Sequence, residues 1–244
     1  MAFFQDTRPS REPFLNAPAS VLILIGVLLA AHVARVLLPE ADANELLTTY
    51  AFIPARYSPA ALAANGFAPA SLYSQIVTFI TYMFLHGSFL HVGVNCLWLL
   101  AFGPSVARRL GTVLFYIFFL VCGVAAALLH LALNWGAIIP VVGASGAIAG
   151  LMGAGIRILY RDRRLRLGER PKLAPVFTGP VLFFSAMWVV VNIIAGVTGL
   201  GTNGGELGIV AWQAHLGGYF AGLFLIGWFD LLSNRRMKPV KLEP

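Results

Sequence analysis

Of the 244 residues of this chain, 59% are hydrophobic and only 11% are charged, and the mean hydropathy is +0.80. Because roughly a quarter of the residues of a soluble domain are charged, this composition excludes an ordinary soluble protein and indicates a single membrane domain. The net charge of +7 would also fit a nucleic-acid-binding protein, but the distribution of the basic residues argues against that.

Several segments are long and apolar enough to cross a bilayer, which takes about 20 residues of helix. They lie at about 19–38, 77–103, 112–134, 143–160, 176–198 and 211–231. The sequence therefore predicts an all-α membrane protein with a bundle of six transmembrane helices. The first segment is too long for a cleaved signal peptide, and no small-residue cleavage site closes it before Pro39, so we expect it to remain in the protein.

The basic residues orient this bundle. Of the 17 lysine and arginine residues, 15 lie on one side of the expected topology. The loops on the other side, at about 39–76, 135–142 and 199–210, contain only Arg56. By the positive-inside rule, both termini are expected in the cytoplasm. The positive charge is then a topological signal, and we expect no nucleic-acid partner.

The same topology divides the chain into a short cytoplasmic segment over 1–18, a membrane domain over 19–231 and a basic cytoplasmic tail over 232–244. Within the domain, the first outer loop at 39–76 carries four prolines among apolar patches. Proline at this density prevents one continuous helix. An exposed loop and an interfacial structure in the outer leaflet both remain open, and the apolar content favours a membrane-associated loop. The short termini and the charge pattern favour the bacterial inner membrane, with an organellar membrane as the open alternative.

Polar side chains are costly inside a membrane and usually face the interior of the bundle. Three clusters of them stand out in chain order. His91 and Asn95 lie four residues apart, on one face of the second segment. Ser145 follows Gly143 and Ala144 at the start of the fourth segment, and His215 lies near the start of the sixth. Each cluster alone also fits a helix cap or a structural hydrogen bond between helices.

The topology brings these clusters to one end of the bundle. The fourth and sixth segments both run inward from the outside, so at 1.5 Å per residue Ser145 and His215 lie at similar depths. Small residues at four-residue spacing let two helices approach closely in lipid. Such pairs occur on both helices: Gly146 and Gly150 on the fourth, Gly218 and Gly222 on the sixth. We therefore expect Ser145 and His215 to lie within hydrogen-bond reach of each other.

This pairing suits nucleophilic catalysis. A serine hydroxyl becomes a nucleophile when a neighbouring base removes its proton, and His215 could do so and later protonate a leaving amine. The resulting oxyanion needs fixed donors, for which the candidates are the side chains of His91 and Asn95 and the backbone N–H of Ser145.

A third catalytic residue is not expected. Asp230 lies at the far end of the sixth segment and Glu206 lies in an outer loop, so we predict a serine–histidine dyad without an acidic partner. Cys96 and Cys122 have no metal-binding spacing, and no metal or cofactor is expected.

Over roughly residues 77–235, the chain resembles the rhomboid intramembrane serine proteases. The resemblance rests on three motifs in order: His-x-x-x-Asn at His91, Gly-x-Ser-Gly around Ser145, and Ala-His-x-x-Gly-x-x-x-Gly from Ala214. It implies a six-helix bundle with a water-filled cavity open to the outside, no cofactor, and cleavage of transmembrane proteins near their outer ends.

The resemblance also implies that 39–76 is embedded in the membrane and that the fifth segment is a lateral gate, with Trp188 similar to a gate tryptophan of bacterial members. Some members stack a tyrosine on the catalytic histidine from one turn after the serine, and this chain has Ala149 there. The departure concerns the orientation of His215 rather than the nucleophile.

Two other functions remain open. A non-catalytic relative would keep the bundle but would need neither Ser145 nor His215. A small transporter would use intramembrane histidines as a proton relay: His86, His91, His130 and His215. Such a relay normally includes intramembrane carboxylates, which the expected segments lack apart from Asp230 at the far end of the last one.

Overall fold

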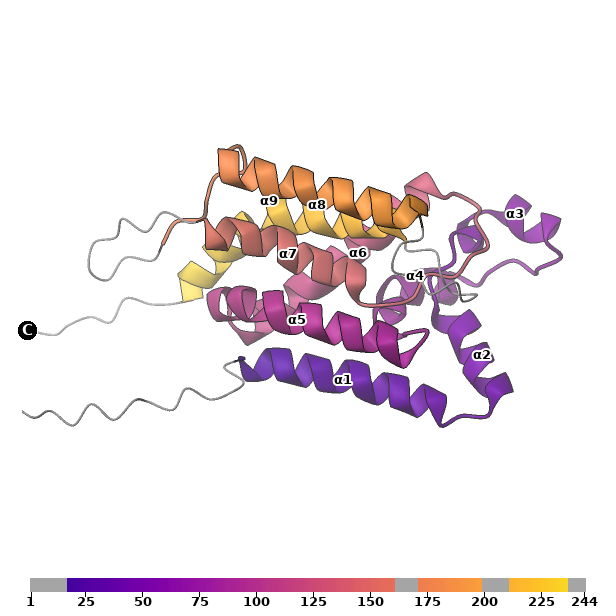
Figure 1. The fold of residues 1–244 in the computed structure, drawn as a ribbon. Coiled ribbons are helices and arrows are strands. Elements are labelled where there is room, and N and C mark those ends of the chain that lie inside the picture. The colour runs from indigo at the N-terminus through magenta and orange to yellow at the C-terminus, as the bar shows by residue number, and fades with distance from the viewer. Residues whose placement is uncertain (1–16, 161–170, 199–210, 237–244) are drawn as a thin grey trace, which may run out of the picture.

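The computed structural model describes residues 17–160, 171–198 and 211–236, which form a bundle of helices (Figure 1). In chain order the elements are α1 (Ala19–Val36), α2 (Glu40–Tyr50), a 3-10 turn (Pro54–Tyr57), α3 (Pro59–Ala64), α4 (Leu72–Thr81), a second 3-10 turn (Tyr82–Phe84), α5 (Phe89–Leu110), α6 (Thr112–Leu133), α7 (Ser145–Leu159), α8 (Gly179–Thr198) and α9 (Trp212–Arg236). The all-helical membrane fold expected from the sequence is confirmed.

The helices of the bundle differ in length, and α7 is shorter than the hydrocarbon core of a bilayer is thick. Within the described residues, α1, α5, α6, α8 and α9 are each long and apolar enough to cross a bilayer. The fourth expected segment becomes α7, which has only 15 residues. At 1.5 Å per residue its length is about 22 Å, against about 30 Å for the hydrocarbon core of a bilayer. The described bundle therefore combines five long helices with two shorter apolar ones, the segment Leu72–Phe84 and α7.

The expected bounds of the second segment, 77–103, are wrong. Residues 77–84 belong to α4 and the second 3-10 turn, and α5 begins at Phe89 and continues to Leu110. The new start has a physical reason: Ser88 has an extended backbone, and its side chain accepts a hydrogen bond from the backbone N–H of His91 at 3.2 Å. A serine cap of this kind satisfies a free donor of the first turn, although hydropathy continues across it.

The first outer loop folds as short helices that pack on the chain leading to α7. Phe52 is fully buried, and its backbone exchanges two hydrogen bonds with Val141, at 3.0 and 2.8 Å. Arg56 donates to the carbonyls of Ala51 and Thr48 at the C-terminal end of α2, where a cation complements the helix dipole. The only basic residue of the expected outer loops thus caps a helix. Association of this loop with the membrane stays a prediction.

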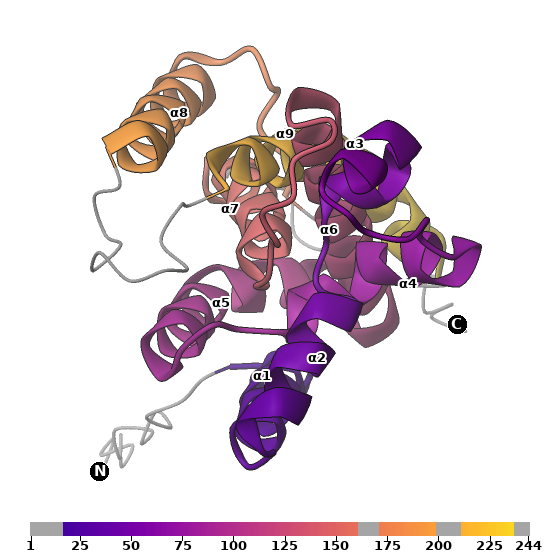
Figure 2. The same cartoon turned by 90° about the vertical axis from the view of Figure 1, so that its right-hand side faces the viewer.

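Two helices of the bundle touch through their backbones. α7 makes its most extensive contact with α9 and also packs against α5 and α6, whereas α8 lies at the edge of the bundle (Figure 2). A Cβ atom added to Gly218 would lie 1.8 Å from the carbonyl oxygen of Gly146, and one on Gly222 would lie 1.8 Å from that of Gly150. No side chain fits between the helices at these points, so the glycines set the distance between α7 and α9.

A further close approach involves a side chain instead. A Cβ atom on Gly123 of α6 would lie 2.0 Å from the sulfur of Met83. Methionine is flexible and can rearrange, so this glycine accommodates a neighbouring side chain and not a second backbone.

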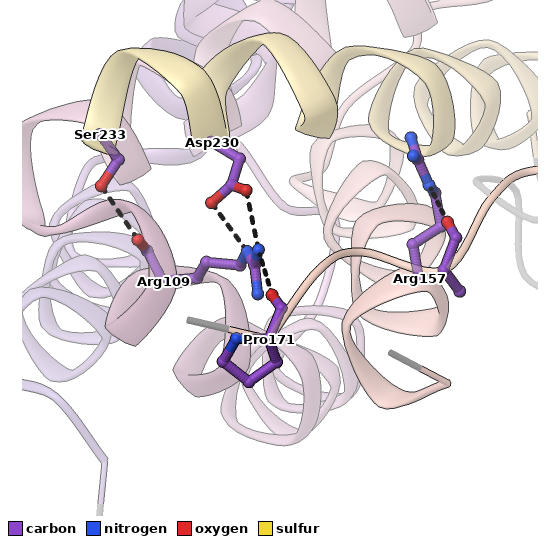
Figure 3. Close-up of polar contacts among 6 residues, drawn as sticks. Arg109, Arg157, Pro171, Asp230 and Ser233 are labelled. Carbon is purple, nitrogen blue, oxygen red and sulfur yellow. Dashed lines mark hydrogen bonds and ion pairs between the residues drawn. The ribbon is translucent and has the colours of Figure 1, made fainter. Parts of the chain in front are cut away.

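At the other end of α9, a buried ion pair joins this helix to α5 (Figure 3). The guanidinium of Arg109 donates to both carboxylate oxygens of Asp230, at 2.8 and 2.7 Å, and also to the carbonyl of Pro171 at 2.9 Å. Ser233 donates to the carbonyl of Arg109 at 3.1 Å. Nearby, Arg157 of α7 donates to a carbonyl of α9. The far end of α9 is therefore held by charged and polar contacts, and Asp230 has a structural partner.

Replacing Asp230 with alanine is expected to lower the free energy of unfolding by about 3–5 kcal/mol, because it removes the carboxylate that pairs with the buried Arg109 guanidinium. Unfolding by SDS in mixed micelles measures the loss. The exposed Asp42 of α2 provides a control, since Asp42→Ala should cost less than about 1 kcal/mol. Equal losses for the two variants would contradict a stabilising role of the ion pair.

Candidate active site

The turn before α7 presents Ser145 at the first position of the helix. Gly143 has a φ of +119° and donates its N–H to the carbonyl of Tyr82 at 2.9 Å. A Cβ atom there would adopt a strained backbone and would lie 2.7 Å from Nε2 of His91. The first described bond inside α7 runs from Ile148 N–H to the Ala144 carbonyl, 2.9 Å. The N–H of Ser145 is therefore one of the free donors at the positive end of the helix dipole.

Ser145 and His215 lie within hydrogen-bond distance. The Oγ atom of Ser145 is 2.8 Å from Nε2 of His215, a normal length for a hydrogen bond of this kind. His215 lies in the first turn of α9, and the glycine contacts begin at Gly146, directly after Ser145, and at Gly218, about one turn after His215. The close backbone contact thus accounts for the short distance between the two side chains.

Asn192 of α8 completes a chain of three side chains that the sequence reasoning did not find. Its Oδ1 atom lies 2.8 Å from Nδ1 of His215, and its Nδ2 atom donates to the carbonyl of Trp212 at 3.0 Å. The side chain is 8% exposed. From the sequence, only carboxylates were candidates for this role, whereas an amide carbonyl accepts the same hydrogen bond. A lone asparagine inside an apolar segment was the available signal, because polar groups are rare there without a partner.

Of the expected oxyanion residues, His91 lies beside the turn that carries Ser145, and neither side chain makes a described hydrogen bond to the serine. The ring of His91 lies against Gly143, two residues before Ser145. Asn95 is 3% exposed and donates from Nδ2 to the carbonyl of His91 at 2.9 Å. Its Oδ1 atom is buried and has no hydrogen-bond partner among the described residues. The structure therefore places His91 beside the turn that carries the serine, and Asn95 one turn after His91 along α5.

His86 also contacts the turn before α7. The buried His86 accepts a hydrogen bond at Nε2 from the backbone N–H of Ala144, 3.4 Å away, and its own carbonyl lies 3.1 Å from Nδ1 of His32 in α1. The rings of His86 and His91 are in contact, with centroids 5.1 Å apart, but His130 bonds to Asn134 at the end of its own helix instead. The described contacts therefore do not link all four histidines of the suggested relay.

Trp188 lies between α8 and α9. Its ring stacks on that of Tyr219 with a centroid distance of 4.3 Å and an interplanar angle of 13°. The hydroxyl of Tyr219 is also 2.8 Å from Oγ of Ser185. One aromatic stack and one hydrogen bond therefore attach α8 to α9 here, and a gate role for Trp188 stays a prediction.

Taken together, the site places a serine hydroxyl against one ring nitrogen of a histidine and an amide oxygen against the other ring nitrogen. The free N–H groups at the start of α7 lie next to that hydroxyl. In the described part of the chain, no group of three or more histidine, cysteine, aspartate or glutamate side chains could hold a metal ion.

A family model described as the rhomboid domain matches residues 73–232, from α4 through most of α9. A comparison with curated protein sequences finds no match.

Proposed function

The chain belongs to the rhomboid family of intramembrane proteases, and from this membership we propose that it is a serine endopeptidase with Ser145 as nucleophile and His215 as base. The observation that supports the proposal most directly is the 2.8 Å distance between Ser145 Oγ and His215 Nε2. A non-catalytic member of the family would need neither residue. The proposed protease domain extends over 19–231, as expected from the sequence.

The proposed reaction proceeds through an acyl-enzyme. Nε2 of His215 takes the hydroxyl proton as Ser145 Oγ bonds to the carbonyl carbon of the scissile peptide. The imidazolium then gives that proton to the leaving amide nitrogen, and the C–N bond breaks. In the second half, His215 removes a proton from water, whose oxygen attacks the ester carbon. The acid product leaves and Ser145 regains its proton.

Donors at the start of α7 would stabilise the tetrahedral oxyanion. The backbone N–H of Ser145 lies at the positive end of the helix dipole, where negative charge is favoured. The side chains of His91 and Asn95 are the further proposed donors. Asn95 uses one N–H of its amide for the carbonyl of His91, and the amide nitrogen carries a second.

The direction of the helices determines which membrane face holds the site. The first residues of α1 and the last residues of α9 lie at the same end of the bundle (Figure 1), and the basic residues assign that end to the cytoplasm. Ser145 and His215 begin their helices at the opposite end. We therefore propose that transmembrane proteins are cleaved near the extracytoplasmic face, in the bacterial inner membrane.

A fluorophosphonate probe tests this function without knowledge of the natural substrate. In detergent-solubilised protein, the probe is expected to modify one residue, and mass spectrometry of the peptides should place the label on Ser145. His215→Ala should lose the label, because the hydroxyl then lacks its base. Absence of any label in the unmodified protein, or a label on another residue, would refute the proposed nucleophile.

A further inference from the structure

The amide of Asn192 lies within hydrogen-bond distance of two partners, one of which can only accept. Its Nδ2 atom is 3.0 Å from the backbone carbonyl oxygen of Trp212, and its Oδ1 atom is 2.8 Å from His215 Nδ1. A carbonyl oxygen only accepts hydrogen bonds. The amide nitrogen must therefore face Trp212, because the reversed orientation would place two acceptors against each other.

The orientation of the amide determines the tautomer of the histidine. An amide oxygen can only accept, so Nδ1 of His215 must carry the hydrogen that lies between them. In a neutral imidazole the other nitrogen then has a free lone pair. That nitrogen, Nε2, is the one that lies 2.8 Å from Ser145 Oγ. Only this tautomer can accept the serine proton.

We propose that Asn192 is a positioning residue, which holds His215 in the tautomer and ring orientation that a general base requires. The inference rests on the proposed function, which it deepens by adding a third residue to the expected pair. Hydrogen bonds run from Ser145 to His215, from His215 to Asn192, and from Asn192 to the Trp212 carbonyl. A side chain of α8 therefore orients His215, which lies on α9. Ala149 leaves no aromatic ring one turn after the serine, and the amide supplies an orienting contact from another side.

Two substitutions of Asn192 test whether the oxygen that accepts from His215 is what matters. Asn192→Ala is expected to lower kcat for a single-span transmembrane peptide by up to about 100-fold, a loss typical of a misplaced catalytic group, while KM changes little. Asn192→Asp keeps an oxygen that accepts from Nδ1, although its second oxygen then faces the Trp212 carbonyl without a hydrogen between them, and it is expected to retain more of kcat than Asn192→Ala. Thermal unfolding in detergent, measured for both variants, reports whether the fold is intact.

Ser185→Ala provides the matched control. Ser185 lies on α8, is buried like Asn192, and bonds to Tyr219 of α9 at 2.8 Å, so its loss weakens the same helix pair without touching His215. The inference predicts a kcat close to that of the unmodified enzyme for this variant. An equal loss in Ser185→Ala and Asn192→Ala, unchanged cleavage in Asn192→Ala, or equal inactivity of Asn192→Asp and Asn192→Ala would each overturn it.

These outcomes are distinct from a failure of the proposed function. If the unmodified protein neither cleaves the peptide nor takes up the fluorophosphonate label, the function itself is wrong. If the unmodified protein is active through Ser145 but Asn192→Ala is equally active, only the positioning role is lost.

Discussion

Ser145→Ala is expected to abolish cleavage of a transmembrane substrate, with a fall in kcat of at least about 10⁴-fold. The hydroxyl that lies 2.8 Å from His215 Nε2 is the only atom in this arrangement that can form the acyl-enzyme, and loss of the serine or histidine of such a unit removes nearly all of its rate enhancement. His215→Ala should have a comparable effect, because the serine then keeps its proton. Both variants are assayed with the reconstituted protein and a single-span peptide.

A smaller effect elsewhere in the site provides the comparison. Asn95→Ala removes one proposed oxyanion donor, which contributes about 2.7–4 kcal/mol at most, while the N–H of Ser145 remains. Its kcat should fall by less than that of Ser145→Ala. Thermal unfolding checks that each variant is folded. Cleavage that persists in Ser145→Ala would reject the protease assignment, and an unaffected Asn95→Ala would remove Asn95 from the oxyanion site.

Gly222→Ala is expected to lower both activity and stability, although Gly222 lies two turns from His215. The added methyl group would lie 1.8 Å from the carbonyl oxygen of Gly150 and 2.6 Å from its Cα atom. Backbone atoms cannot rotate away as a side chain does, so α7 and α9 must separate. A displacement of about 1 Å can cost about 100-fold in rate, and overpacking costs about 1–3 kcal/mol in stability. Both kcat and resistance to SDS should therefore decrease.

Gly227→Ala is the matched substitution on the same helix. A Cβ atom at Gly227 meets only the end of the Arg157 side chain, at 3.8 Å, which is an ordinary van der Waals distance. Activity and stability should stay close to those of the unmodified protein. If Gly222→Ala were tolerated as well as Gly227→Ala, the glycine contact would not determine the distance between Ser145 and His215.

Much of the fold could be predicted because hydropathy and small-residue spacing have direct physical causes. Apolar length predicted the spanning helices, and the four-residue spacing of glycines predicted which two helices touch. The start of α5 could not be predicted in this way. Hydropathy is continuous across residues 77–103, whereas the helix begins where the side chain of Ser88 caps it. Cap geometry is a local hydrogen bond that an average over 20 residues does not register.

The candidate site, too, could be predicted only in part. Motif spacing and helix direction together predicted that Ser145 and His215 meet, because both residues begin helices that enter from the same side. Asn192 could not be assigned from spacing, since its partner is 23 positions away and the rotation of α8 about its own axis decides which way the amide points. The ion pair of Arg109 could not be predicted for the same reason, because its partner Asp230 is 121 positions away.

The contact between α7 and α9 also has a consequence for suppressor genetics. Where a glycine faces a side chain, as Gly123 faces Met83, a larger residue can be compensated by a smaller residue opposite. Gly218 and Gly222 face main-chain carbonyls, which every amino acid possesses. A selection for restored growth or activity after Gly222→Ala should therefore return true revertants, and second-site mutations at the facing positions should be rare.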